Sequence, residues 1–230
     1  MMKILAPNFY KKYFEKLALP LLICSIALFL IGGYEIFFVS PIDYQQGEMV
    51  KVMYIHVPAA WMALGLYVVI GILSFFSVVW RIRMGYIASI AIAPVGCAFA
   101  LITLITGSLW GKPIWGTFWV WDARLTSMLV LFLLYLAYIA VINAGDDFAR
   151  SEKPASIIAL LGFVNVPIVK FSVDFWNSLH QPASIVRMGG VSIDPSMMKP
   201  LIIIFFAYVF FASSMIMFRM KSILVAMRSN

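Results

Sequence analysis

The segment that separates the third and fourth long apolar runs of the chain reads Trp115-Gly116-Thr117-Phe118-Trp119-Val120-Trp121-Asp122-Ala123-Arg124-Leu125-Thr126. Three tryptophans and a phenylalanine fall within its first seven positions, and one acid and one base follow them. Aromatic rings offer flat apolar contact area, and the two charged side chains add polar contacts at its edge. The segment is therefore typical of a surface that binds a large, flat, mostly apolar ligand with a few charged groups.

The composition around this segment is that of a membrane protein. Of 230 residues, 63% are hydrophobic and 12% are charged, whereas a soluble domain has about 25% charged residues. The net charge of +7 comes from basic residues spread along the chain, so we expect no nucleic-acid partner and take the excess as a sign of membrane orientation. The two cysteines, Cys24 and Cys97, lie in apolar runs, where an inert thiol is expected.

Six apolar runs are long enough to span a bilayer, which takes about 17–25 residues. We therefore predict an all-α integral membrane protein with one domain over residues 1–230 and six transmembrane helices. The fifth run is the shortest, and it contains Asn165 and Pro167, which could break its helix. The predicted spans cover residues 17–39, 57–80, 86–109, 125–142, 155–173 and 201–218.

Charge asymmetry predicts the orientation of these spans. An even number of spans places both termini on one side, and 11 of the 17 basic residues fall on that side. The positive-inside rule then makes both termini cytoplasmic. The tryptophan-rich segment 110–124 faces outward, into the periplasm of a Gram-negative bacterium. The six basic residues on the outer side are Lys51, Lys112, Arg124, Lys170, Arg187 and Lys199.

The only two histidines, His56 and His180, both fall on the outer side, each two residues before a proline. Proline favours the first helical position, so we expect Pro58 to begin the second span and His56 to lie just before it. A helix N-terminus disfavours positive charge, and the neutral imidazole is the form that ligates metals. Each histidine could instead be an interfacial residue bonded to a backbone carbonyl or to water.

Two histidines beside a tryptophan-rich surface suggest a haem site. Haem iron takes two axial ligands, and histidine is a frequent one, so His56 and His180 are the candidate iron ligands. The two haem propionates need cations, and Arg124 is the first candidate because arginine holds carboxylates bidentately; Lys51 and Arg187 are weaker ones. Alternatively, Arg124 pairs with Asp122 or extends to the membrane surface, and the tryptophans are interfacial anchors. The helical or extended conformation of segment 115–121 stays open.

The segment 115–126 is similar to the tryptophan-rich WWD motif of haem-handling membrane proteins, W-G-x-x-W-x-W-D-x-R-L-T, and matches every fixed position. In size and span layout the chain resembles the haem exporter protein C family of bacterial cytochrome c maturation. The resemblance implies that His56 and His180 bind haem, and that a short periplasmic surface helix connects the third and fourth spans. The candidate haem-contacting residues are Trp115, Trp119, Trp121, Asp122, Arg124, Lys51 and Arg187.

The resemblance also implies a role. A member of this family lies in the bacterial inner membrane and is not an enzyme; it carries haem b as cargo and delivers it to a membrane-anchored periplasmic haem chaperone. It associates with the ATPase and permease subunits of an ABC transporter and with a small single-span subunit. This chain has no G-x-x-x-x-G-K-[ST] loop, so ATP use would belong to a partner.

Three other functions remain as alternatives. Haem lyases share the tryptophan motif but are far longer than 230 residues. A b-type cytochrome subunit of a quinol oxidoreductase also uses two axial histidines, normally within the helix bundle. Secondary transporters often show paired repeats and polar residues at the bilayer midplane, and neither is evident here.

Overall fold

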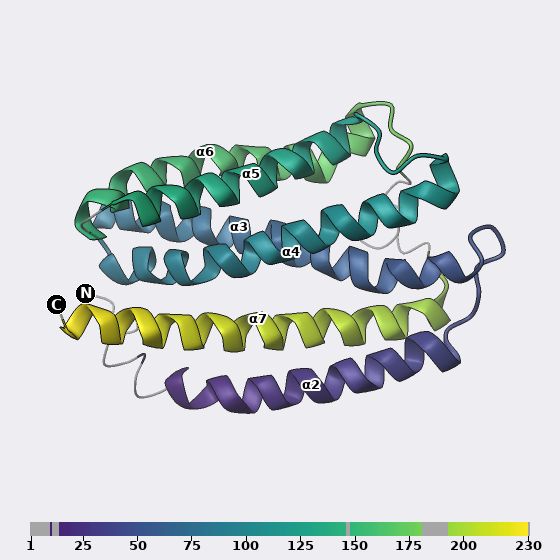
Figure 1. Cartoon of the computed structure of the whole chain (residues 1–230), viewed down its shortest axis with the longest axis horizontal. Coiled ribbons are helices and arrows are strands. Elements are labelled where there is room, and N and C mark those ends of the chain that lie inside the picture. The colour runs from purple at the N-terminus through teal and green to yellow at the C-terminus, as the bar shows by residue number, and fades with distance from the viewer. Residues whose placement is uncertain (1–9, 11–13, 146–147, 181–192, 230) are drawn as a thin grey trace.

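The computed structural model describes residues 10, 14–145, 148–180 and 193–229. Six helices in this part of the chain are long and apolar enough to cross a membrane (Figure 1). This confirms the predicted all-α fold with six spans. The helices are α2 (Ala18–Tyr34), α3 (Met53–Trp80), α4 (Arg83–Trp115), α5 (Ala123–Ala144), α6 (Phe148–Phe175) and α7 (Pro195–Ser229).

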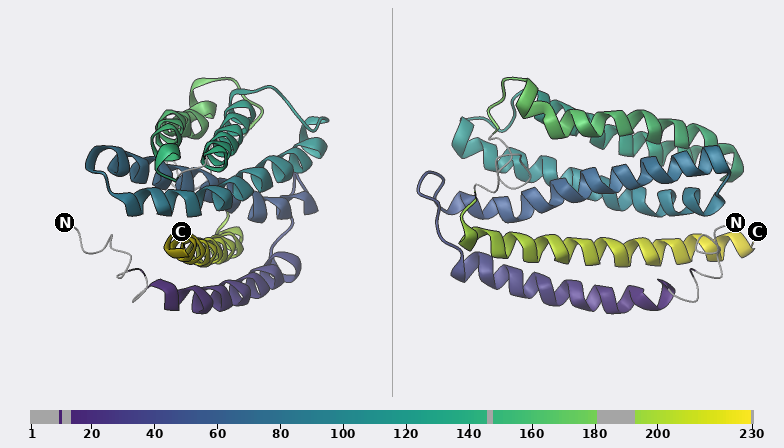
Figure 2. Two further views of the ribbon diagram at one scale, coloured as in Figure 1. Left: turned by 60° about the vertical axis from the view of Figure 1, so that its left-hand side comes forward. Right: turned by 180° about the vertical axis from the view of Figure 1, so that it is seen from behind.

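Successive helices run in opposite directions along one bundle axis, and they form layers (Figures 1 and 2). The pair α5 and α6 lies on one side, α3 and α4 form the middle, α7 follows, and α2 is outermost. Helix α3 packs against α4, α6 and α7, whereas α2 packs mainly against α7. The core therefore lies around α3 and α4.

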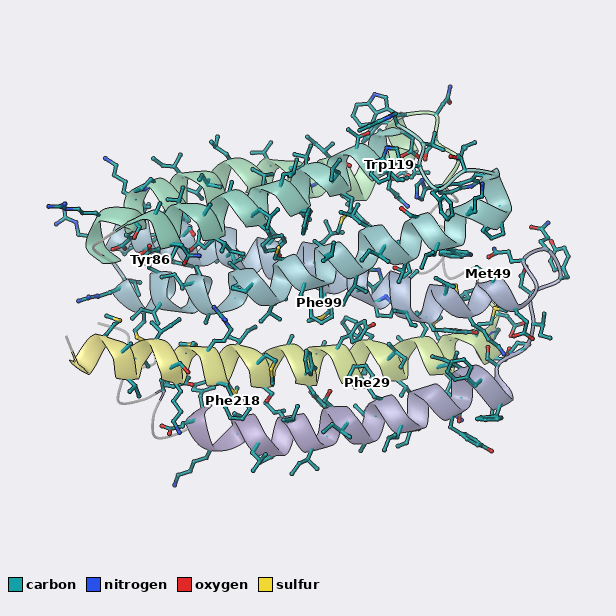
Figure 3. All side chains as sticks on the ribbon, viewed as in Figure 1. Phe29, Met49, Tyr86, Phe99, Trp119 and Phe218 are labelled. Atoms are coloured by element: carbon teal, nitrogen blue, oxygen red, sulfur yellow. The ribbon has the colours of Figure 1, made fainter. Side chains whose placement is uncertain are left out.

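The two ends of the bundle differ in their connections. The end of α4 and the start of α5, which flank the tryptophan-rich segment, lie at one end, and we name this the tryptophan end. The start of α3 and the start of α7 lie there too (Figure 1). The start of α2 and the end of α7 lie together at the opposite end, as an even number of spans requires. Figure 3 shows Trp119 at the tryptophan end and Tyr86 at the opposite end.

Buried tyrosines connect the core helices through their hydroxyl groups. Tyr67 and Tyr135 are fully buried, and their rings meet edge to face at 4.8 Å. The Tyr135 hydroxyl donates to the carbonyl of Ala63 at 2.7 Å, and the Tyr67 hydroxyl donates to that of Ile158 at 3.3 Å. A buried hydroxyl needs such a partner because no water replaces it in the membrane.

Small residues and one ion pair attach α2 to α7. Ser25 Oγ donates to the Ala207 carbonyl at 2.9 Å, and a Cβ at Gly32 would come within 2.6 Å of Ile204. Small side chains of this kind let membrane helices approach closely. At the tryptophan end, α2 continues into the π-helical turn η4 (Glu35–Val39), where Glu35 pairs with Lys199 at the start of α7, 2.6 Å apart.

Helices α3 to α7 extend beyond the predicted spans at every end except Trp80, where α3 ends as predicted. The fifth span is confirmed over Arg150–Phe175, and it is continuous through Pro167. Asn165 does not break the helix either. Its side-chain amide bonds to a neighbouring helix instead, donating to the Ser127 carbonyl of α5 at 2.9 Å. The length of an apolar run indicates where a helix crosses the membrane, but the helix itself continues through polar residues into the interface.

A candidate haem-binding cavity at the tryptophan end

A cavity of about 340 Å³ opens between α3, α4 and α5 at the tryptophan end. This volume lies in the range of small-molecule and cofactor sites. Both histidines line it, although 124 residues of sequence separate position 56 from position 180. The other predicted site residues that line it are Trp115, Trp119 and Arg124.

His56 lies inside helix α3, which corrects the expectation that it precedes the helix. The helix begins at Met53, after the 3-10 turn η5 (Glu48–Val52), and Pro58 is its sixth residue. A proline so near the start removes only one hydrogen bond, the one that the Tyr54 carbonyl would accept. His56 thus has a helical backbone, which fixes its side chain against α4.

The hydrogen bond that His56 makes determines which of its ring nitrogens is available. Nδ1 of His56 lies 3.0 Å from Oγ1 of Thr106, and this hydroxyl donates its own proton to the Ile102 carbonyl at 2.6 Å. Because a hydroxyl has one proton, Oγ1 accepts from Nδ1–H. The neutral ring then carries its lone pair on Nε2, the form that ligates a metal.

Two glycines of α4 make room for the rings of this site. A Cβ at Gly107 would lie 2.9 Å from Cε1 of His56, and one at Gly111 would lie 2.6 Å from the ring of Trp115. The His56 ring also meets Trp110 edge to face, with centroids 5.7 Å apart. Trp110 is itself held by its Nε1, which donates to Gln46 at 2.8 Å.

His180 is oriented by a carboxylate. Its Nδ1 lies 2.8 Å from Oδ2 of Asp122, and Oδ2 also accepts from the hydroxyl of Ser178. The other oxygen, Oδ1, accepts from the Leu125 amide at 2.8 Å and so caps the start of α5. An ionised carboxylate only accepts, so Nδ1 of His180 carries the proton and Nε2 carries the lone pair.

The electrostatics of this pair favour a charged aspartate and a neutral histidine. Burial disfavours a charged carboxylate, but hydrogen bonds from Ser178, the Leu125 amide and His180 hold the pKa of Asp122 below its ordinary value. Burial also lowers the pKa of His180, and the hydrogen bond to Asp122 offsets only part of this effect. His180 is therefore a neutral imidazole at pH 7.

The tryptophan-rich segment does not form the separate surface helix that the family resemblance implied. Trp115 ends α4, and Gly116 caps it in the left-handed conformation, with φ of 76°. No helix is assigned from there to Asp122, where α5 is capped. A left-handed residue cannot continue a right-handed helix, and glycine adopts it without strain.

This backbone turns the three tryptophans of the segment in different directions. Trp115 lies against His180, with ring centroids 4.7 Å apart, and Trp119 also lines the cavity. Among the described residues, the buried Nε1 of Trp119 has no hydrogen-bond partner. Trp121 is 75% exposed and touches the cavity only through Trp119, which it meets edge to face at 5.4 Å.

Of the two predicted cations that the structure describes, Arg124 lines the cavity and Lys51 does not. Arg124 does not pair with Asp122; it donates to the Ser172 hydroxyl and to the Lys170 carbonyl, both at 3.4 Å. Lys51 does not line the cavity and pairs with Glu48 at 2.6 Å. Arg187 lies outside the described residues.

Sequence reasoning missed the residues that hold the histidines in place. Thr106 and Gly107 gave no signal, because their role depends on which face of α4 meets α3. Ser178 stands two residues before His180 and could have been suspected as a local hydrogen-bond partner. The sequence placed Lys170 only among the basic residues of the outer side, yet it also lines the cavity.

Comparison with known proteins gives a consistent result. The family model described as "Heme exporter protein C" matches residues 1–230. The chain is similar to "Heme exporter protein C" of Bradyrhizobium diazoefficiens, with 50% identity over 184 residues, which cover 80% of this chain and 70% of that protein. It is also similar to "Heme exporter protein C" of Escherichia coli (strain K12), with 42% identity over 210 residues, covering 91% and 84%.

A mitochondrial protein of Marchantia polymorpha is similar as well. It is named "Putative cytochrome c biosynthesis ccmC-like mitochondrial protein" and is 42% identical over 193 residues, covering 84% of this chain and 82% of that protein. The six spans and the bacterial relatives make this chain a multi-pass protein of the bacterial inner membrane. With a family model matched over its full length, the chain belongs to the heme exporter protein C family.

Proposed function

We propose that this protein binds haem as cargo in the cavity at the tryptophan end, during haem export for cytochrome c maturation. His56 and His180 are its axial ligands. The observation that carries the proposal is that the two imidazole rings are in the same tautomer, with the proton on Nδ1. Each ring donates from Nδ1 to a fixed acceptor, Thr106 or Asp122, which leaves the lone pair on Nε2, and both histidines line the same cavity.

The other cavity residues fit the remaining parts of a haem. Trp115 and Trp119 give apolar contact to the porphyrin, since aromatic side chains bury about 150–250 Å² each. The unpartnered Nε1 of Trp119 is a donor that a ligand oxygen can satisfy. Arg124 lines the cavity, and its long hydrogen bonds are readily exchanged for the stronger pair that a propionate offers.

We further propose that the tryptophan end faces the periplasm. The excess of basic residues on the terminal side supports this orientation through the positive-inside rule. The cargo, haem b, then passes to a membrane-anchored periplasmic chaperone, and the protein itself performs no chemical conversion. An ABC transporter and a small single-span subunit are its proposed membrane partners. Reporter fusions after Arg83 and Trp121 test the orientation, and a cytoplasmic signal at Trp121 would contradict it.

A visible spectrum of the purified protein tests the ligands. A bis-histidine haem is low-spin, with sharp α and β bands after reduction. Replacement of His56 or His180 by Ala abolishes this spectrum, and added imidazole restores it by occupying the vacant axial position. The imidazole rescue is the control for folding. An unchanged low-spin spectrum in either variant would show that this histidine is no ligand.

The position of His56 favours one second candidate, a b-type cytochrome subunit. His56 lies within a spanning helix, as the axial ligands of such subunits normally do. His180 lies in the connection after α6, which favours an exchangeable cargo site. Rapid and reversible reduction of the bound haem by a quinol would support the cytochrome; haem transfer to the chaperone without turnover of quinol supports the proposal.

A further inference from the structure

A second cavity, which shares no lining residue with the first, lies on the side of the bundle where α2, α4 and α7 meet. Its volume is about 430 Å³, and apolar side chains from all three helices line it. Arg219 is the single charged residue among them. Three aromatic contacts close its inner end: Tyr208 meets Phe29 at 5.5 Å and Phe99 at 5.0 Å, and Phe29 meets Phe211 at 6.5 Å.

This cavity, which we call the groove, extends along α7 over about the thickness of one membrane leaflet. Tyr208 and Arg219 are separated by about 16 Å along α7, at 1.5 Å per residue, and half of the hydrocarbon core is about 15 Å. Arg219 directly follows the uncharged run 201–218, so it stands at the level of the lipid headgroups. Figure 3 shows the same direction, with Phe29 and Phe99 near the middle of the bundle and Phe218 closer to the opposite end.

Arg219 is held in place by a hydrogen bond to α4. Its Nε donates to the Ala91 carbonyl of α4 at 3.2 Å. The carbonyl of the preceding residue, Ile90, has no helical donor because position 94 of α4 is a proline. Within the described part of the chain, no carboxylate lies within salt-bridge distance of Arg219. A cation at the level of the headgroups attracts anionic lipid headgroups.

We propose that this groove binds an anionic phospholipid of the leaflet at the opposite end of the bundle, with an acyl chain along α7 and its phosphate on Arg219. The apolar groove excludes a water-soluble anion, and the guanidinium selects a lipid with negative charge, because arginine pairs with phosphate bidentately. Such a lipid fills the space between α2 and the rest of the bundle and supports the outermost helix. The inference is independent of the haem site.

Native mass spectrometry of the purified full chain tests the proposal. The protein in detergent is titrated with phosphatidylglycerol or with phosphatidylcholine of the same acyl chains, and bound lipids are counted. We expect wild type to prefer phosphatidylglycerol, and Arg219→Met to bind it about tenfold more weakly, as loss of one charge-assisted contact predicts. The matched control is Lys221→Met, an equal charge change on α7 at a residue that pairs with Glu15 and does not line the groove.

A second variant tests the acyl part of the site. Ala98 lines the groove and is exposed, so Ala98→Trp fills it and weakens both lipids alike while Arg219 stays in place. A far-ultraviolet circular dichroism spectrum equal to that of wild type shows that each variant is folded. The proposal fails if wild type binds both lipids equally, or if Arg219→Met binds phosphatidylglycerol as wild type does. It also fails if a photo-crosslinker at position 98 labels a protein rather than a lipid in native membranes.

Discussion

Asp122 Oδ2 lies 2.8 Å from Nδ1 of His180, whereas the corresponding nitrogen of His56 meets the neutral hydroxyl of Thr106 at 3.0 Å. A carboxylate acceptor raises the basicity of a ligating imidazole more than a hydroxyl does. The two axial ligands proposed here are therefore unequal. In the proposed haem complex we expect His180 to be the stronger donor to iron and His56 to be the ligand that exchanges more readily when haem leaves.

The first prediction concerns Asp122→Asn. Asparagine is as good an N-cap as aspartate, so α5 keeps its start while His180 loses its charged acceptor. We expect a low-spin haem with a higher reduction potential, because the weaker donor stabilises ferric iron less, and about 10–100-fold weaker haem retention. A potentiometric titration measures the change. Glu48→Gln removes a carboxylate at the same end outside the cavity and serves as control; an unchanged potential in Asp122→Asn would refute the inequality of the ligands.

The second prediction concerns pH. Burial holds the pKa of His180 below the ordinary value of 6.5, so the neutral ring that iron needs is kept throughout the range above 6.5. The contribution of this ring to folding stability is likewise complete above 6.5, and it is lost as the pH falls from 6.5 toward the lower folded-state pKa. Haem affinity, measured by absorbance titration, should stay constant from pH 8 to about 6.5 and decrease only below. A midpoint above 6.5 would contradict the assignment.

The third prediction concerns Thr106→Val, which keeps the shape of the side chain but removes the acceptor for His56. A hydrogen bond of this kind contributes about 0.5–1.5 kcal/mol, so haem should bind up to about tenfold more weakly. Electron paramagnetic resonance of the ferric protein should show a wider spread of ligand orientations. Thr103→Val is the matched control, because Thr103 lines the same cavity but its hydroxyl donates to the Phe99 carbonyl one turn away rather than bonding to a histidine ring. Equal effects of both variants would assign Thr106 a purely structural role.

The number and order of the spans followed from the sequence because a bilayer sets a minimum apolar length that few other structures need. The helix ends did not follow. Helix α4 continues to Trp115 and α7 begins at Pro195, since a helix beyond the hydrocarbon core is limited by capping rather than by hydropathy. The predicted start of α3 at Pro58 was also wrong. A proline is tolerated in the first turns of a helix, but it does not mark the first residue.

The sequence predicted only the part of the candidate site that follows from the order of the spans, namely which residues lie at the same end of the bundle. His56, His180 and the tryptophans share one side of the membrane, and this sufficed to predict that they meet. The side chains that orient the two histidines could not be predicted. Their identity depends on how α3, α4 and α5 are rotated about their axes, and no short sequence pattern indicates this rotation. Lys51 shows the limit: it lies on the correct side, but Glu48, three residues earlier, pairs with it.

The fourth prediction separates the tryptophans, which the sequence could only treat as one group. Trp115 and Trp119 line the cavity, whereas Trp121 does not. Replacement of Trp115 or Trp119 by Ala should lower haem retention, and Trp121→Ala should retain haem while chaperone loading decreases. Haem content per protein and loading of the chaperone are measured in the same membranes. Trp176→Ala is the control, because Trp176 is 54% exposed and does not line the cavity; loss of haem in Trp121→Ala would contradict this division.

The last prediction concerns the close approach of α3 and α4 at Gly107. A methyl group there would lie 2.9 Å from Cε1 of His56, so Gly107→Ala forces the imidazole away from Thr106 and from the iron position. Overpacking of this kind costs about 1–3 kcal/mol. Rotation of the His56 ring relieves the clash with the least movement of the backbone. We expect loss of the low-spin spectrum with the protein still folded, and recovery on addition of imidazole. Gly65→Ala is the matched control, since nothing lies within 4 Å of a Cβ at that helical position, and alanine there should stabilise α3 by about 0.5–1 kcal/mol. If Gly107→Ala keeps a wild-type spectrum, His56 is not held against this face of α4, and its role as an axial ligand loses its geometric basis.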